Sequence, residues 1–385
     1  MVKVKILILF AVVAVVACVP FKQTRKPKEQ SLDFKNFIHQ QSLRNSLNDP
    51  ISKRNYYDSF LVESTDEEIM NLNATNFRLP NNTIPSHYDI FIRTDIHAGY
   101  FGFSGTVRIN IRAIEASNFI TLHTMQSSIS SITVFNADGS VFQEDAAYTF
   151  DSFVQFLNIN LDRNLLADQD YVVEISYSST LMGSSNGFYR SWYSDDSMSF
   201  WVATTHFQPT FARHAFPCYD EVRYRTTFDI RIQHHNSYNA ISNMPISSVE
   251  ENENDFVTTI FERTLAMPTY LLAFSVSNFD FVQNTDVDLP VRVHARPAAI
   301  ALGQANDALE LSERYLRTME DFFEIPYTLP KSDVLANLGW REVVSWGLIK
   351  IDEFWLLEID QQEWRRNRRE AQLAKEYSVS QNIKK

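Results

Sequence analysis

The chain has 385 residues, a formal net charge of −12, 44% hydrophobic residues and 13% aromatic residues. This length suits about two domains with a sizeable buried core, and the negative charge argues against nucleic acid or an anionic membrane surface as a general partner. The nine glycines form no G-x-G-x-x-G or G-x-x-x-x-G-K-[ST] pattern, which argues against a nucleotide-dependent enzyme.

The N-terminus is typical of a targeting segment. Lys3 and Lys5 precede an apolar run over residues 6–19, which is short for a membrane span but suits the core of a signal peptide. We therefore expect residues 1–18 to be a signal peptide and the protein to be secreted. An uncleaved signal anchor is the alternative, and it would place the protein on the extracellular side of the plasma membrane.

Two glycosylation sequons, at Asn73 and Asn81, support an extracellular location. Cleavage of the signal peptide would leave Cys218 as the sole cysteine, so we expect no intramolecular disulfide and a buried, inert thiol. The nearby Asp220 would raise the pKa of that thiol, whereas His214 is the one neighbour that favours a reactive cysteine.

Residues 19–76 are polar and poorly periodic, which is typical of a flexible stalk or pro-segment. From residue 77 onward, short runs of alternating apolar residues predict β-strands. These runs are His87–Arg93, Thr106–Arg112, Phe119–His123, Ile129–Phe135, Val154–Leu161, Tyr171–Tyr177, Ser199–Thr204, Thr226–Gln233, Ala240–Asn243, Phe256–Phe261 and Tyr270–Val276. Their number and spacing predict an antiparallel all-β domain over residues 77–284, either a sandwich or a curved saddle.

A second domain is predicted over residues 285–360. It opens with a strand at Pro290–Ala295 and continues with an amphipathic helix at Ala305–Phe323, whose apolar residues recur every three or four positions. Residues 361–385 form a basic, helix-prone tail. Such a tail can bind acidic surfaces, but most basic runs are solvated faces, and we expect the latter here.

The stretch Trp201–Glu221, WVATTHFQPTFARHAFPCYDE, places charged residues among many aromatic ones. Charged side chains are seldom fully buried unless they are paired, so we expect Arg213 to form an ion pair with Asp220 or with Glu221. Residue chemistry alone identifies no active site, because no H-E-x-x-H, Cys-x-x-Cys or G-x-S-x-G motif occurs.

A series of collinear blocks adds a family resemblance. In order they are LPNNTIPSHYDI, FSGTVRINI, ITLHT, GFYRSWY, TTHFQPTFARHAFPCYDE, SNMP, MPTYLLAFSVSNF, FFEIPYTLPKSD and WGLIKIDE. Together they resemble the N-terminal part of the aminopeptidase N family of zinc metallopeptidases, particularly its insect members, from about Leu79 to Glu353. The resemblance implies a mainly β fold, with an N-terminal antiparallel β-saddle domain followed by the incomplete start of an α/β, thermolysin-like catalytic domain.

The resemblance also bears on the cofactor. In that family, two histidines of H-E-x-x-H and a downstream glutamate hold zinc, and all of them lie C-terminal to the WGLI block. The sequence to Lys385 contains no such motif, so we expect no cofactor in this chain and zinc only in full-length members of the family.

Within the matched blocks, substrate-facing positions differ from the family pattern. His206 stands where the family has a glutamine that lines the pocket for the first substrate residue, and Gln208 stands where it has a glutamate. Val344 replaces the glutamate that binds the free α-amino group of a peptide, and Ser345 replaces an asparagine. Glu342 is acidic but lies two positions away. Because a valine cannot pair with an ammonium group, we expect recognition of a peptide N-terminus to fail.

These observations leave three hypotheses. The first is a secreted, non-catalytic relative of aminopeptidase N that binds a peptide or a protein. The second is a fragment or truncated gene model of an active zinc aminopeptidase that removes N-terminal residues from peptides. The third is a structural or interaction module of another kind. We further expect self-association through apolar side chains that the second domain exposes, namely Trp346, Leu348, Phe354, Trp355, Leu356 and Leu357.

Overall fold

The computed structural model describes residues 77–359, apart from 126, 196–197, 287 and 339–341. The expected signal peptide, the stalk, Asn73 and the basic tail all lie outside the described residues. Within them, no helix has the length and apolar character needed to cross a membrane.

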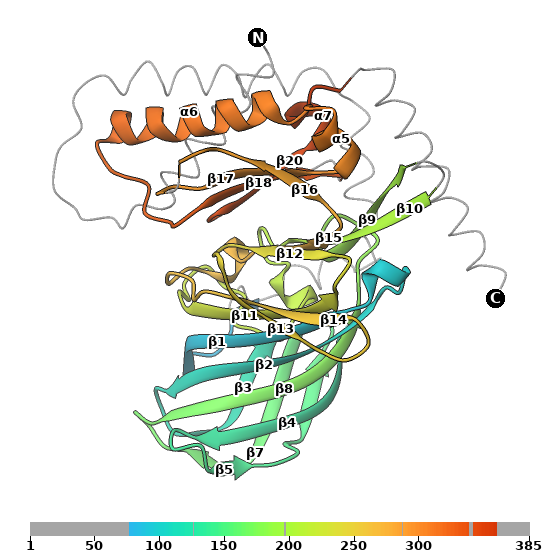
Figure 1. The fold of residues 1–385 in the computed structure, drawn as a ribbon. Coiled ribbons are helices and arrows are strands. Elements are labelled where there is room, and N and C mark those ends of the chain that lie inside the picture. Colours follow the sequence, from blue (N-terminus) through green and yellow to red (C-terminus); the bar gives the residue numbers. More distant parts are fainter. Residues whose placement is uncertain (1–76, 126, 196–197, 287, 339–341, 360–385) are drawn as a thin grey trace, which may run out of the picture. The chain divides into compact units, whose positions relative to one another are not determined.

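The largest layer is an eight-stranded sheet with the order β13-β14-β11-β1-β2-β8-β4-β5 (Figure 1). Alternation of apolar residues builds it: in β1, Tyr88, Ile90 and Ile92 are fully buried while the intervening side chains face outward. The strands are β1 Thr83–Thr94, β2 Gly102–Ala113, β4 Ser128–Asn136, β5 Val141–Gln143, β8 Asp170–Thr180, β11 Thr227–His235, β13 Ile246–Glu251 and β14 Phe256–Phe261. The sheet is antiparallel except for the pair β1–β11, which is parallel.

Two smaller sheets complete the β region. The three-stranded sheet β3-β7-β6 comprises Ser117–His123, Phe156–Leu165 and Tyr148–Asp151, and its buried residues Ile120, Leu157 and Ile159 belong to the same hydrophobic core as Ile109 of β2. The four-stranded sheet β12-β15-β10-β9 comprises Asn239–Ser242, Phe274–Ser277, Met198–His206 and Gly187–Asp195. Short 3-10 helices are η2 Ile96–Ala98, η3 Ala212–His214 and η4 Thr269–Leu271. The mainly β fold predicted from the sequence is confirmed.

The C-terminal part of the described chain is an α/β layer. A five-stranded sheet has the order β16-β17-β18-β20-β19, in which β17, β18 and β20 are parallel. Its elements are β16 Asp280–Gln283, β17 Val291–Ala295, α5 Pro297–Ala301, α6 Asn306–Phe323, β18 Ser332–Asn337, β19 Val343–Ser345, β20 Leu348–Asp352 and α7 Glu353–Leu356. Helix α6 lies along this sheet (Figure 1), and its Leu316 and Met319 pack with Val291.

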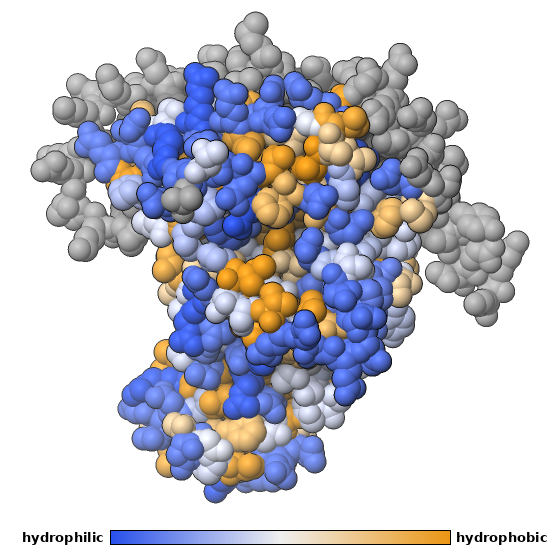
Figure 2. Space-filling model, in the orientation of Figure 1, coloured by the Kyte–Doolittle hydropathy of each residue, from blue (hydrophilic) through white to orange (hydrophobic). Residues whose placement is uncertain are grey.

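One prediction about this layer is wrong. Trp346, Leu348, Leu356 and Leu357 are buried rather than exposed, and Phe354 and Trp355 are half-buried. The parallel sheet and its helices form their own apolar clusters, and these clusters, together with the β-region core, enclose the four buried side chains. Figure 2 shows hydrophobic residues interspersed among hydrophilic ones on the visible face. Self-association stays a prediction, and the exposed apolar side chains that could carry it in this layer are Phe281, Leu302 and Phe322.

Candidate functional site

The fold brings together two segments that the sequence analysis singled out. His206 is the last residue of β10, Gln208 follows two positions later, and Val344 and Ser345 belong to β19. The side-chain amide of Gln208 donates a hydrogen bond from Nε2 to the carbonyl oxygen of Val344, at 2.8 Å. Residues 136 positions apart in the sequence are thus held in direct contact.

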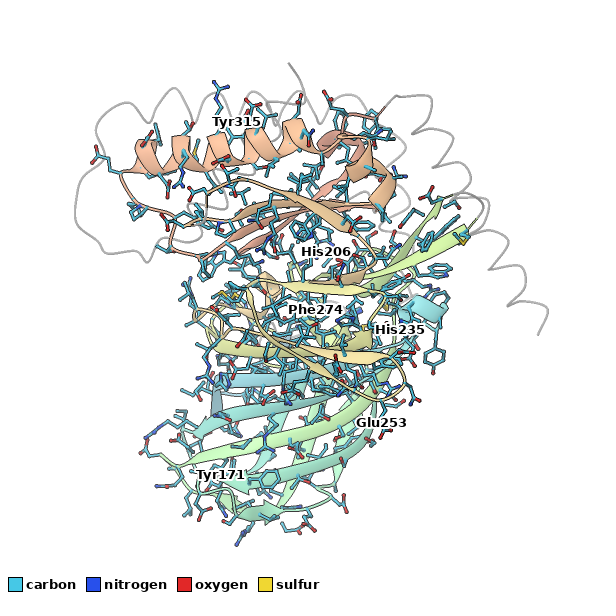
Figure 3. All side chains as sticks on the ribbon, in the orientation of Figure 1. Tyr171, His206, His235, Glu253, Phe274 and Tyr315 are labelled. Atoms are coloured by element: carbon cyan, nitrogen blue, oxygen red, sulfur yellow. The ribbon has the colours of Figure 1, made fainter. Side chains whose placement is uncertain are left out.

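His206 is almost fully buried, with 6% of its surface exposed. Its Nδ1 lies 2.7 Å from the carbonyl oxygen of Ser185, and this acceptor requires the ring proton to be on Nδ1. Figure 3 places His206 near Phe274, which begins the neighbouring strand β15. This hydrogen bond joins the imidazole to the segment that precedes β9.

Val344 occupies the position at which the family resemblance implies a glutamate, and it is apolar. Val344 is buried, and its main chain is held by Gln208. The hydroxyl of Ser345 is also buried and has no hydrogen-bond partner among the residues that the structure describes. Glu342 is half-buried just before β19, and in the described ranges it makes no ion pair or hydrogen bond. The structure therefore joins Gln208 with Val344, and no carboxylate from the described part of the chain is hydrogen-bonded to either residue.

Sequence reasoning missed Lys350, whose side chain contacts Thr205 of β10, the residue before His206. It is fully buried in β20, and its Nζ lies 3.1 Å from Thr205 Oγ1 and also donates to the Thr205 carbonyl oxygen. Because burial disfavours the ammonium form, the pKa of Lys350 falls to about 7. The signal in the sequence was a lone lysine within the apolar run WGLIKI.

A second buried lysine has a different environment. Lys331 Nζ lies 2.7 Å from Asp333 Oδ2 and donates to the carbonyl oxygens of Ser242 and Gly347. Burial alone would raise the pKa of the Asp333 carboxyl, but Lys331 and His294 hold it well below its usual value. Asp333 is therefore ionised, and Lys331 and Asp333 form a buried structural pair.

The charged residues after His206 also form pairs. Arg213 Nε lies 3.0 Å from Asp220 Oδ2, so Asp220 is the partner that the structure selects, whereas Glu221 pairs with Arg223 at 2.6 Å. Burial raises the pKa of Asp220, and Arg213 and the Thr269 hydroxyl offset part of that effect. These contacts tie η3 to its surroundings, which is a structural role.

Cys218 is fully buried, as the sequence predicted. Burial and then the charge of Asp220 raise the pKa of its thiol well above the usual value. Burial also lowers the pKa of His214 to about 4, so its imidazole is neutral near pH 7 and supplies no positive charge for a thiolate. The environment is that of an inert thiol.

The described residues do not fit a zinc site, because nowhere in residues 77–359, outside the gaps, do three histidine, cysteine or carboxylate side chains come together. The remaining sequon residue, Asn81, is exposed, and its side-chain oxygen accepts a hydrogen bond from Arg223. The sequon threonine, Thr83, is buried, with its hydroxyl 2.8 Å from that of Tyr219.

Comparisons with known proteins agree with this architecture. Residues 84–271 match the peptidase M1 N-terminal domain. The chain is 33% identical over 277 residues to the thyrotropin-releasing hormone-degrading ectoenzyme of Rattus norvegicus, a match that covers 71% of this chain and 26% of that protein. It is 32% identical over 301 residues to aminopeptidase Q of Homo sapiens, covering 73% and 30%. It is 33% identical over 308 residues to the membrane alanyl aminopeptidase of Manduca sexta, covering 74% and 31%.

The chain thus spans between a quarter and a third of the length of these curated relatives. The matched segment includes β10 and η3, and Gln208 lies between these two elements. Residues 84–271 belong to the peptidase M1 N-terminal domain family, and the chain therefore carries the N-terminal region of an aminopeptidase N (M1) family protein.

Proposed function

We propose that this protein is an extracellular, non-catalytic M1 relative that binds a peptide or a protein without removing N-terminal residues. One observation carries the proposal. Val344, at the position where the family resemblance implies an amine-binding glutamate, is buried and held through its main chain by Gln208.

Electrostatics explains why this position matters. A desolvated ammonium group needs a charged or strongly polar partner, and leaving it unpaired costs several kcal/mol. Val344 supplies no charge, and Gln208 has committed one of its amide N–H groups to the Val344 carbonyl. The Ser345 hydroxyl is buried, so it does not supply a partner for the ammonium group either. We therefore expect the affinity for a peptide to be independent of whether its N-terminal amine is free.

A direct assay tests the proposal. The purified full chain, supplied with zinc, is incubated with alanyl and leucyl anilides and compared with a blank without protein. We expect turnover no higher than the blank. Turnover above the blank that a metal chelator abolishes would contradict the proposal.

An extracellular location is supported by the relatives named as an ectoenzyme and as a membrane alanyl aminopeptidase, and by the exposed side chain of Asn81. Expression in a eukaryotic secretory host should yield a glycosylated product in the medium or on the cell surface. Retention of an unglycosylated product in the cytosol would contradict this location.

A second candidate function is the N-terminal part of a longer, active zinc aminopeptidase. The observation that favours it is the length of the relatives, of which the chain covers 26–31%. Sequencing of full-length transcripts tests it. Reads that continue past Lys385 into an H-E-x-x-H motif would establish this function, and their uniform absence would exclude it.

A further inference from the structure

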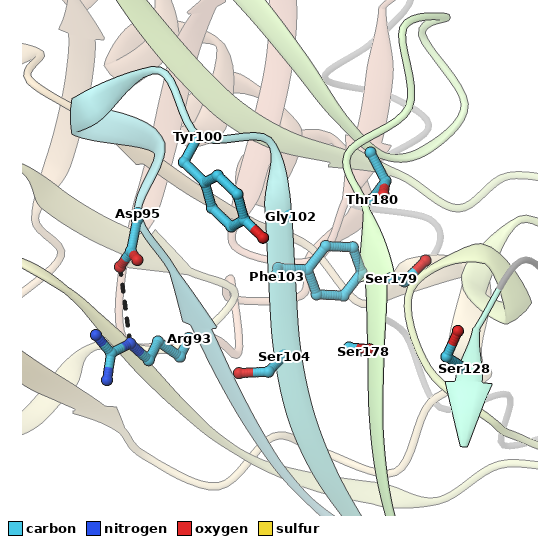
Figure 4. Close-up of a pocket in the computed structure, with 10 residues that line it drawn as sticks. All are labelled: Arg93, Asp95, Tyr100, Gly102, Phe103, Ser104, Ser128, Ser178, Ser179 and Thr180. Atoms are coloured by element: carbon cyan, nitrogen blue, oxygen red, sulfur yellow. Dashed lines mark ion pairs between the residues drawn. The ribbon is translucent and has the colours of Figure 1, made fainter. Parts of the chain in front are cut away.

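A polar pocket of about 370 Å³ lies on the solvent-facing side of the eight-stranded sheet. It shares no residue with the candidate site described above. Arg93 of β1, Asp95, Tyr100, Ser104 of β2, Ser128 of β4, and Ser178 and Thr180 of β8 surround it (Figure 4). Its volume lies at the lower end of the range for small-molecule sites, roughly 300–1,000 Å³.

Strand register builds the floor of this pocket. Arg93 pairs with Ser104, Ser104 with Ser178, and Ser178 with Ser128, so four neighbouring strands contribute one row of side chains to the same face. Three of the four are serines, whose short side chains leave space above the sheet. With neighbouring strands about 4.8 Å apart, this row is about 14 Å long.

An aromatic ring forms one wall. Tyr100 lies against Gly102 so closely that a Cβ atom on Gly102 would be 2.6–2.7 Å from Oη, Cζ and Cε1 of the tyrosine. The tyrosine nevertheless keeps 63% of its surface exposed. One edge of the tyrosine ring therefore packs against Gly102, where a side chain would clash with it, and the rest of the ring stays exposed to a ligand.

The charges of the pocket are balanced and fixed. Arg93 Nε lies 3.7 Å from Asp95 Oδ1, and the Arg93 guanidinium lies 4.6 Å from the centre of the Phe256 ring. Asp95 Oδ1 is buried and has no hydrogen-bond partner in the described part of the chain. Because Oδ1 is buried it does not meet a ligand, but the Asp95 side chain is 35% exposed, and the exposed part of its carboxylate can accept a hydrogen bond. The pocket has no excess positive charge to attract an anion.

The hydroxyl groups of the pocket are also available. Within the described residues, those of Tyr100, Ser104, Ser128, Ser178 and Thr180 take part in no hydrogen bond. Hydroxyl groups both donate and accept, so five of them, together with a carboxylate and a guanidinium, suit a ligand that carries many hydroxyl groups of its own. A mainly apolar ligand would leave these groups without partners.

We infer that this pocket binds carbohydrate, specifically neutral pyranose residues that lie across the serine row with one C–H face against Tyr100. The ring face of tyrosine carries partial negative charge and attracts the weakly positive C–H groups of a sugar. The Asp95 carboxylate accepts hydrogen bonds from the sugar hydroxyl groups, and the Arg93 guanidinium donates hydrogen bonds to them. Balanced charge disfavours phosphate and acidic sugars, and a single carboxylate disfavours a metal ion.

Ligand-observed NMR tests the inference on the full chain after enzymatic removal of its N-glycans. The probes are the methyl glycosides of glucose, mannose, galactose, N-acetylglucosamine and fucose. We expect saturation transfer to at least one of them. Tyr100→Ala and Gly102→Ala should each weaken its binding at least tenfold, because the first removes the ring and the second displaces it.

Ser130→Ala is the matched control, since Ser130 is an exposed β4 serine outside the pocket, and it should bind like the wild type. Circular dichroism confirms that each variant is folded. Failure of all five glycosides to bind, or equal binding by wild type and both Tyr100→Ala and Gly102→Ala, would overturn the inference. Repeating the titration with the glycosylated chain shows whether its own glycans compete for the pocket.

Discussion

At the scale of single residues, the two buried lysines show how an ammonium group can be accommodated in different ways. Lys331 has a carboxylate partner, Asp333, together with two carbonyl acceptors. Lys350 has only the hydroxyl and carbonyl oxygens of the threonines at the end of β10. The folded state therefore stabilises the charge on Lys331 more than the charge on Lys350.

Lys350 should make stability depend on pH. Its pKa is about 7 in the folded chain against an ordinary value of 10.5, because of burial. Between these values the unfolded chain binds more protons, so stability should rise with pH through that window, by up to about 1.4 kcal/mol per pH unit. Below pH 7 both states hold the proton and this contribution is constant.

The measurement is urea unfolding from pH 6 to pH 10 for the wild type and Lys350→Met. We expect the wild-type free energy of unfolding to rise relative to that of the variant above pH 7, and the two curves to run parallel below it. Since other groups titrate equally in both proteins, the difference between their free energies of unfolding reports the titration of Lys350 alone. Parallel curves over the whole pH range would show that the pKa of Lys350 is not lowered in the folded chain.

At the scale of elements, the turn between β19 and β20 fixes the strand that carries Val344. Gly347 has φ of +70°, and a Cβ atom there would lie 2.1 Å from the carbonyl oxygen of Asn243. Only glycine fits both the left-handed backbone and this close approach. The turn therefore locks β19 against the segment that follows β12.

Gly347→Ala should be strongly destabilising. Gly139→Ala is the matched control, because Gly139 has φ of +84° but no atom near its missing Cβ. The control should cost about 1 kcal/mol from backbone strain alone. Gly347→Ala should cost at least about 2 kcal/mol more, since the clash forces backbone to move. Equal losses in thermal unfolding would show that the contact with Asn243 is unimportant.

Alternation of apolar residues made most β-strands predictable. The runs at Thr106–Arg112 and Thr226–Gln233 correspond to β2 and β11, because one face of each strand is buried and the other is less so. Strand β18 has no alternation, since all six of its residues are buried between parallel neighbours, and it was missed. The run Tyr270–Val276 begins as η4 rather than as a strand.

The candidate site was only partly predictable. The family resemblance indicated His206, Gln208 and Val344 as individual positions, but no local pattern predicts a hydrogen bond between residues 136 positions apart. The lowered pKa of Lys350 could not be predicted from the sequence either, because it depends on burial by elements distant in the sequence. Long-range packing decides both features.

At the scale of the whole molecule, buried polar contacts cross the predicted boundary near residue 284. Asn243 Nδ2 donates to the carbonyl oxygens of Leu271 and Trp346, and Asn243 Oδ1 accepts from the Ala273 amide. Lys331 adds its bond to Ser242. Residues 79–359 belong to one compact unit, so the β region and the α/β layer should unfold together.

Calorimetry checks this expectation. The wild type should show one transition, with equal calorimetric and van't Hoff enthalpies. Asn243→Ala leaves buried backbone groups without partners at about 1–3 kcal/mol each, so it should lower stability by at least about 2 kcal/mol. Two separate wild-type transitions, or an Asn243→Ala variant as stable as the wild type, would show that the two regions are independent.

The most direct test of the central claim compares peptides that differ only in their N-terminus. Isothermal titration calorimetry with one peptide series, with free or acetylated N-termini, measures the affinity ratio for the wild type and for Val344→Glu. We predict that the wild type binds both forms equally and that Val344→Glu prefers the free amine. A wild-type preference of tenfold or more for the free amine would contradict the account.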